Sequence, residues 1–153
     1  MNRFAMKTVF GVLFLMAGMM LSAQTEKKPE MLTKETFLQK VYNYEKNPTE
    51  WVYEGDKPCI IDFYADWCGP CRKIAPYMEE FMTTYAGQIY VYKINTDQQK
   101  ELTIKFQAQR IPLVLFVPKK GKPTQLLGAY PKESYIEMIE SVLLGKSAKK
   151  VEN

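Results

Sequence analysis

A pair of cysteines, Cys68 and Cys71, is the part of this sequence best suited to chemistry. They stand in the segment 66–71, which reads DWCGPC. A separation of three residues places two side chains on the same side of a helical turn, close enough for their sulfur atoms to bond. Such a pair can cycle between a dithiol and a disulfide, or it can supply two of the four ligands of a zinc site. The spacing alone leaves both chemistries open.

The overall composition excludes several classes of protein. The chain has 153 residues with no histidine, three cysteines and a formal net charge of +4. Without histidine there is no Ser-His-Asp triad, no Cys-His protease pair, no HExxH zinc helix and no His-ligated haem or copper. The charge is too small to predict nucleic-acid binding. The third cysteine, Cys59, lies on a predicted strand of its own, so the third and fourth ligands of a zinc site are missing and we expect no metal and no cofactor. We expect Cys59 to be a small buried apolar residue, with a redox or regulatory thiol as the alternative.

The N-terminus has the pattern of a secretory signal peptide. Arg3 and Lys7 precede an uncharged apolar stretch at residues 9–21, and Ala23 precedes a polar segment. The apolar stretch is short for a membrane-spanning helix, which needs about 20 residues. We therefore expect residues 1–23 to be removed on export to the periplasm, with a retained anchor or a buried core helix as the alternatives.

Periodicity predicts helices that alternate with strands. Apolar residues at helical spacing predict helices at residues 33–46, 68–85, 97–106 and 131–145. Short apolar or alternating runs predict strands at residues 59–65, 90–95, 113–117 and 124–127, with a further short strand near 51–53. Strands that alternate with helices form parallel pairs, whereas the last two long strands are joined by a turn and form an antiparallel hairpin. The fold class is therefore α/β, with a mixed central sheet and flanking helices.

The cysteine pair falls where the predicted strand at 59–65 gives way to the helix at 68–85. Cys68 is expected at the N-terminus of this helix, where unpaired backbone N–H groups and the helix dipole stabilise a thiolate. Gly69 and Pro70 suit a helix beginning, because proline needs no hydrogen-bond donor in the first turn. We expect Cys68 to be the exposed attacking thiol and Cys71 to lie behind it.

The sequence around the cysteines resembles the active-site segment of the thioredoxin family. Residues 61–71 read IDFYADWCGPC and are followed by Ile-Ala-Pro at 74–76. Further matches along the chain are residues 93–97, Ile111-Pro112 at the position of the family's cis-proline, Gly121, and Gly128-Ala129. The resemblance covers about residues 50–145 and implies a thioredoxin fold. The expected parts of the chain are a signal peptide (1–23), an N-terminal helical extension (24–50), the thioredoxin-like domain (51–145) and a polar tail (146–153).

The resemblance also implies roles for individual residues. Cys68 would attack the disulfide of a client protein, and Cys71 would then release the reduced client. Asp62 matches the buried acid that exchanges a proton with Cys71, and burial in an apolar strand should raise its pKa; a structural carboxylate is the alternative. Lys93 matches the basic partner of this acid. The active-site loop would be Trp67, Gly69 and Pro70, and the client strand would dock on Trp67, Ile111, Pro112, Gly128 and Ala129.

The resemblance implies a protein-disulfide reductase that serves electron transport and cell redox homeostasis in the periplasm. Its partners would be disulfide-containing client proteins and a membrane thiol–disulfide electron donor. The uncharged Gly69 and Pro70 favour the reducing direction, because they do not over-stabilise the thiolate. A disulfide oxidant or isomerase of the same fold, and a non-catalytic module that binds clients, are the alternatives. Arg110 and Leu113 depart from the family's usual residues beside the docking surface, so we expect them to influence the choice of client.

Overall fold

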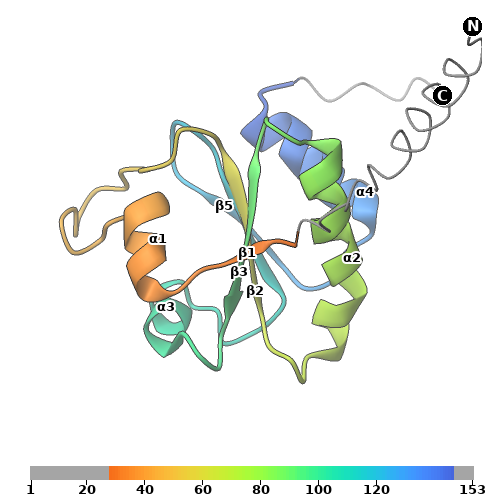
Figure 1. Cartoon of the computed structure of the whole chain (residues 1–153), viewed down its shortest axis with the longest axis horizontal. Coiled ribbons are helices and arrows are strands. Elements are labelled where there is room, and N and C mark those ends of the chain that lie inside the picture. Colours follow the sequence, from red (N-terminus) through yellow and green to blue (C-terminus); the bar gives the residue numbers. More distant parts are fainter. Residues whose placement is uncertain (1–27, 147–153) are drawn as a thin grey trace, which may run out of the picture.

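A five-stranded mixed sheet forms the centre of the protein, in a computed structural model that describes residues 28–146 (Figure 1). The expected signal peptide and nearly all of the expected polar tail lie outside the described residues. The strands are β1 (Glu30–Met31), β2 (Cys59–Tyr64), β3 (Tyr90–Asn95), β4 (Leu113–Val117) and β5 (Thr124–Leu127). Their order in the sheet is β1-β3-β2-β4-β5. The β1–β3 and β2–β3 pairs are parallel, and the β2–β4 and β4–β5 pairs are antiparallel, which confirms the predicted mixed sheet.

Helices cover both faces of this sheet. They are α1 (Lys34–Lys40), α2 (Gly69–Thr84), α3 (Lys100–Lys105) and α4 (Lys132–Met138), and the π-helical turn η1 (Ile139–Leu143) continues α4. Figure 1 shows α1 and α3 on one face and α2 and α4 on the other. No helix in the described part of the chain combines the length and the apolar character needed to cross a bilayer.

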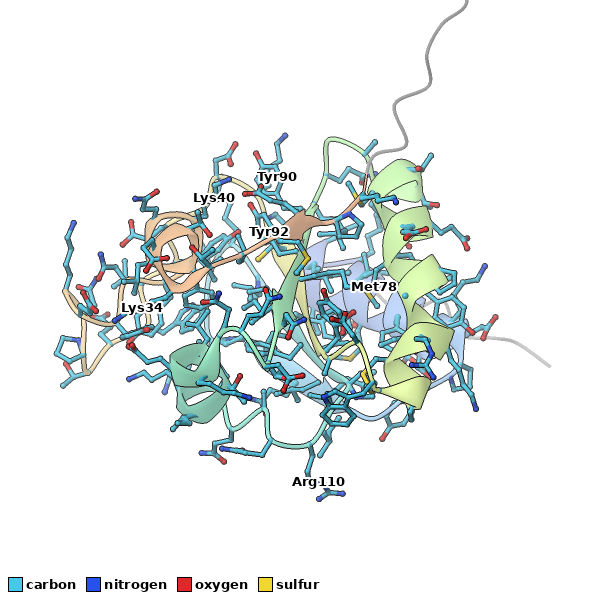
Figure 2. All side chains as sticks on the ribbon, turned by 60° about the horizontal axis from the view of Figure 1, so that its bottom comes forward. Lys34, Lys40, Met78, Tyr90, Tyr92 and Arg110 are labelled. Atoms are coloured by element: carbon cyan, nitrogen blue, oxygen red, sulfur yellow. A yellow bond between two sulfur atoms is a disulfide. The ribbon has the colours of Figure 1, made fainter. Side chains whose placement is uncertain are left out.

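The alternation of side chains along β2 divides the core into two clusters. Ile61 and Phe63 belong to the cluster that contains residues of α1 and α3, whereas Ile60 belongs to the cluster with α2 and α4. Met78, on the buried side of α2, is fully buried in this second cluster (Figure 2). Asp62 has the same parity as Ile60, and side chains two residues apart on a strand share one face. The strand therefore places a carboxylate on the α2 side of the sheet.

The segment before β2 differs from its prediction. The helix predicted at 33–46 ends at Lys40, and the next residues form an irregular aromatic segment in which Tyr42 and Tyr53 make an isolated antiparallel bridge. Val41 and Tyr44 produced the helical pattern, and both are buried, but against the α1/α3 face of the sheet from a non-helical backbone. Tertiary packing, not helical periodicity, accounts for their burial.

One further strand and one helix boundary differ from the prediction, each for a local reason. The edge strand β1 was not predicted, because two residues are too few to show a period. The helix predicted from Asp97 begins instead at Lys100. The side-chain oxygen of Asn95 accepts the N–H of Asp97, and its carbonyl accepts the N–H groups of Gln98 and Gln99, so these residues form a turn.

Candidate active site

Cys68 and Cys71 form a disulfide bond at the start of α2. The S–S distance is 2.01 Å and the two Cα atoms are 5.3 Å apart. Cys68 is the N-cap residue of the helix, and its Sγ accepts a hydrogen bond from the backbone N–H of Cys71 at 3.2 Å. Both residues are 3% exposed, so Cys68 is not the more accessible of the two in the disulfide form. What distinguishes Cys68 is its place at the helix N-terminus, where backbone N–H groups stabilise negative charge.

Short contacts fix the turn that leads from β2 into α2. The N–H of Cys68 bonds to the carbonyl of Ala65 at 3.1 Å, which closes the turn ahead of the helix. The guanidinium of Arg72 donates to the carbonyl of Asp66 at 3.0 Å. Pro70 lies in the first turn of the helix, as predicted. The local sequence therefore determines where the helix begins and which sulfur receives its first free N–H groups.

Asp62 is a fully buried acid in β2, the strand that precedes the cysteine pair. Neither carboxylate oxygen has a hydrogen-bond partner among the described residues, and the Nζ atom of Lys93 lies 4.0 Å from Oδ2. Burial raises the pKa of Asp62 to about 6, and the positive charge of Lys93 opposes part of that increase. A carboxyl group with this pKa can accept or return a proton near neutral pH.

Lys93 has a second partner that the sequence reasoning missed. Its Nζ lies 4.0 Å from the centre of the Tyr64 ring, while its side chain keeps 17% of its surface exposed. Tyr64 follows Asp62 by two residues in β2, so the two side chains share a face. That spacing was visible in the sequence, but the register of β3 that brings Lys93 between them was not.

Two of the predicted docking residues, Trp67 and Ile111, lie beside the cysteine pair. Trp67 is 69% exposed, and its indole N–H donates to the Asp97 carboxylate at 2.8 Å, which together with Lys100 holds the pKa of Asp97 below its usual range. Ile111 packs against the cluster formed by Ala65, Cys68 and Cys71, and the Ile111–Pro112 peptide bond is cis, as the resemblance implied.

The turn at Gly128 and Ala129 is held by a backbone hydrogen bond to Pro112 and by the side chain of Tyr135. Gly128 donates its N–H to the carbonyl of Pro112 at 2.8 Å and has a φ of +107°, a conformation that favours glycine. Ala129 is exposed beside it. The Tyr135 hydroxyl, from α4, donates to the Gly128 carbonyl and accepts the N–H of Tyr130, both at 3.2 Å. Tyr135 therefore supports the turn, a role that the sequence reasoning did not assign.

A groove of about 290 Å³ extends from Trp67 and Ile111 toward α3. Its lining includes Ile104, which is 68% exposed although it is apolar. Arg110 is exposed beside this groove, and in Figure 2 its side chain projects from the body of the protein. Leu113 is 3% exposed and lies in the core near α1 and α3. The side chain of Leu113 therefore does not border the docking surface, contrary to expectation, because it faces inward.

Cys59 is a free, fully buried thiol at the other end of β2. Burial raises its pKa to about 12, so it is a poor nucleophile at neutral pH. Within residues 28–146, no three His, Cys, Asp or Glu side chains are grouped so as to hold a metal ion.

Comparison with known proteins identifies relatives along most of the chain. The family model described as thioredoxin matches residues 29–141 and thus includes β1 and α1, which precede the region of expected resemblance. The thioredoxin of Borreliella burgdorferi is 39% identical over 109 residues, covering 71% of this chain and 92% of the relative. The thioredoxin of Alicyclobacillus acidocaldarius is 46% identical over 92 residues, covering 59% and 86%. The chloroplastic M-type thioredoxin of Spinacia oleracea is 39% identical over 94 residues, covering 61% of this chain but only 52% of the relative.

Proposed function

The chain belongs to the thioredoxin family of thiol–disulfide oxidoreductases, and we propose that it reduces disulfide bonds in exported client proteins through Cys68 and Cys71. The observation that carries this proposal is the Cys68–Cys71 disulfide at the start of α2, with the Cys68 sulfur accepting a backbone N–H. Backbone N–H groups aimed at a sulfur stabilise its thiolate, the form that attacks disulfides.

The proposed reaction transfers two electrons in two exchange steps. In the reduced protein the Cys68 thiolate attacks one sulfur of the client disulfide, and the other client sulfur leaves as a thiolate. Cys71 then loses its proton and attacks the Cys68 sulfur, which breaks the mixed disulfide. The client leaves with both sulfurs reduced, and the protein ends with the Cys68–Cys71 disulfide.

Asp62 is the proposed acceptor of the Cys71 proton. Its carboxyl group is buried, makes no hydrogen bond to the described residues, and has a pKa raised to about 6. Such a group is largely ionised at neutral pH yet remains a better base than an exposed carboxylate. Lys93 supports the ionised form from 4.0 Å away.

We place the protein in the periplasm after removal of residues 1–23. The basic, apolar and small-residue pattern of the N-terminus supports this location. An oxidising compartment does not return electrons to an oxidised dithiol, so a membrane thiol–disulfide protein is the proposed donor. The reducing direction is supported by Gly69 and Pro70, which bring no charge between the two sulfurs.

Reduction of insulin disulfides tests the proposal. The wild-type protein, kept reduced by dithiothreitol, should accelerate insulin precipitation, and Cys68→Ser should abolish the acceleration. Cys59→Ala is the matched control, because this cysteine is buried away from the disulfide and its loss should leave the rate unchanged. Client binding without any acceleration would contradict the reductase proposal and favour a non-catalytic module.

A further inference from the structure

We propose that Tyr64 is a positioning residue for proton transfer, because the face of its ring holds the Lys93 ammonium at the distance from which that charge acts on Asp62. The proposal rests on the role given above to Asp62, but it can be tested by titration without any turnover.

The three side chains meet through the register of the sheet. Asp62 of β2 lies opposite Lys93 of β3, and Tyr64 is the next residue of β2 on the same face. The Lys93 Nζ is 4.0 Å from the Asp62 Oδ2 and 4.0 Å from the centre of the Tyr64 ring. The ammonium therefore lies within reach of both the carboxylate and the aromatic face.

The carboxylate does not fix the lysine by itself. At 4.0 Å the ammonium and the Asp62 oxygen are beyond hydrogen-bond distance, and neither oxygen has a bond to the described residues. A lysine side chain is flexible and strongly hydrated, and this one is 17% exposed, so water competes for it. An aromatic face attracts a cation within about 6 Å of its centre. The ring is thus the second attraction that keeps the ammonium over the buried acid.

The ring itself is held from two sides. Tyr64 packs against the small cluster formed by Ala65, Cys68 and Cys71. Its hydroxyl contacts the Met31 sulfur at 3.7 Å, and Met31 of β1 lies opposite Lys93 in the sheet. These contacts separate two functions of Tyr64, since the ring faces Lys93 while the hydroxyl faces Met31.

Among residues 28–146, the elements packed around Asp62 bring few other groups that can titrate or carry charge in the oxidised protein. On α2, Cys68 and Cys71 are joined as a disulfide and do not titrate. On α4, the Tyr135 hydroxyl is engaged with Gly128 and stays neutral below the pKa of a phenol, which burial raises further. On β4, the residue opposite Asp62 is the apolar Val114. The titration of Asp62 therefore reports mainly its burial and the position of Lys93.

The test is the carboxyl ¹³C NMR titration of Asp62 in the oxidised full-length protein. Tyr64→Leu should raise the pKa of Asp62 by about one half to one pH unit, a fraction of the effect of a fully placed opposite charge. Tyr64→Phe is the matched control, because it keeps the ring and removes only the hydroxyl, and it should leave that pKa unchanged. In a Lys93→Gln background, where that pKa is already higher, Tyr64→Leu should add nothing.

Two results would overturn the proposal. An equal effect of Tyr64→Leu with and without Lys93 would mean that the ring acts on Asp62 through burial alone. An effect of Tyr64→Phe as large as that of Tyr64→Leu would assign the role to the hydroxyl and Met31. If Tyr64→Leu does not fold, pentafluorophenylalanine at position 64 takes its place. This residue keeps the shape of the ring and reverses the charge distribution of its face, so it should raise the pKa of Asp62. An unchanged pKa would refute the proposal.

The pH dependence of client release gives a kinetic readout of the same position. A rise of a full unit in the Asp62 pKa would lower its ionised fraction at pH 6 from about one half to about one tenth. For a rise of one half to one unit in Tyr64→Leu, the second exchange step should slow about two- to fivefold at pH 6 and recover above pH 8. Absence of reductase activity in the wild type would refute the proposed function, whereas the NMR titration would still decide the role of Tyr64.

Discussion

Replacing Asp62 with asparagine should change the stability of the oxidised protein, relative to wild type, in favour of the variant as the pH rises. Burial raises the pKa of Asp62 from the usual 3.8 to about 6. Below pH 3.8 the carboxyl group is protonated in both the folded and the unfolded chain. Between pH 3.8 and 6 the unfolded chain loses this proton while the folded protein keeps it, so the stability of the wild type falls as the pH rises; above pH 6 the loss is complete. A difference of about two pH units corresponds to about 3 kcal/mol.

Urea unfolding at pH 4 and pH 8 measures this effect. The substituted asparagine would carry its own packing and desolvation cost, but that cost is the same at both pH values. The stability difference between Asp62→Asn and wild type should therefore become more favourable to the variant by about 2 to 3 kcal/mol from pH 4 to pH 8. Asp66→Asn is the matched control, because Asp66 is an exposed carboxylate of the same strand-to-helix junction and should show no such change. An equal stability difference at both pH values would refute the account of Asp62 as a buried acid whose pKa is raised in the folded protein.

Four further predictions concern the reaction and the chain terminus. Cys71→Ser should accumulate mixed disulfides with clients on non-reducing gels, and Cys68→Ser should not; the reverse would exchange the two roles. Asp62→Asn should slow client release several-fold in stopped-flow measurements with little effect on formation of the mixed disulfide, and unchanged release between pH 6 and 9 would leave Asp62 a structural carboxylate. Equilibration with glutathione should give a reduction potential below about −200 mV, whereas a value near about −120 mV would make the protein a donor of disulfides. Intact-mass analysis of envelope protein should show a chain that begins at Gln24, and a mass that includes Met1 would rule out cleavage.

The structure could be predicted well from the sequence where a single short segment determines both the fold and the position of the reactive residues. The run from β2 into α2 has an apolar strand, a turn and a proline in the first helical turn, so the positions of Cys68, Cys71 and Asp62 follow from local rules. The hairpin of β4 and β5 was predictable for the same reason, because a short turn joins two adjacent strands.

Features that depend on contacts between distant segments could not be predicted in this way. Val41 and Tyr44 fit a helical period, yet neither lies in a helix. They are buried because they pack in the core cluster between the sheet, α1 and α3. Leu113 faces the α1/α3 side of the sheet together with its partner Phe63 of β2, and this pairing joins strands that are far apart in the sequence. The contact between Tyr64 and Lys93 likewise needs the register of two strands separated by the whole of α2.

The junction of β2 and α2 gives two ionisable partners of the reaction opposite environments. At the helix N-terminus, Cys68 receives a backbone N–H on its sulfur, which favours negative charge there. Within β2, Asp62 is buried without a hydrogen bond to the described residues, which disfavours negative charge. A thiolate that forms readily suits the first attack, and a carboxylate that readily takes a proton suits the release of Cys71. Burial of the Asp62 carboxylate also lowers the free energy of unfolding above pH 6, and Asp62→Asn should remove that loss at pH 8. The buried acid that we propose to assist client release should therefore also weaken the fold.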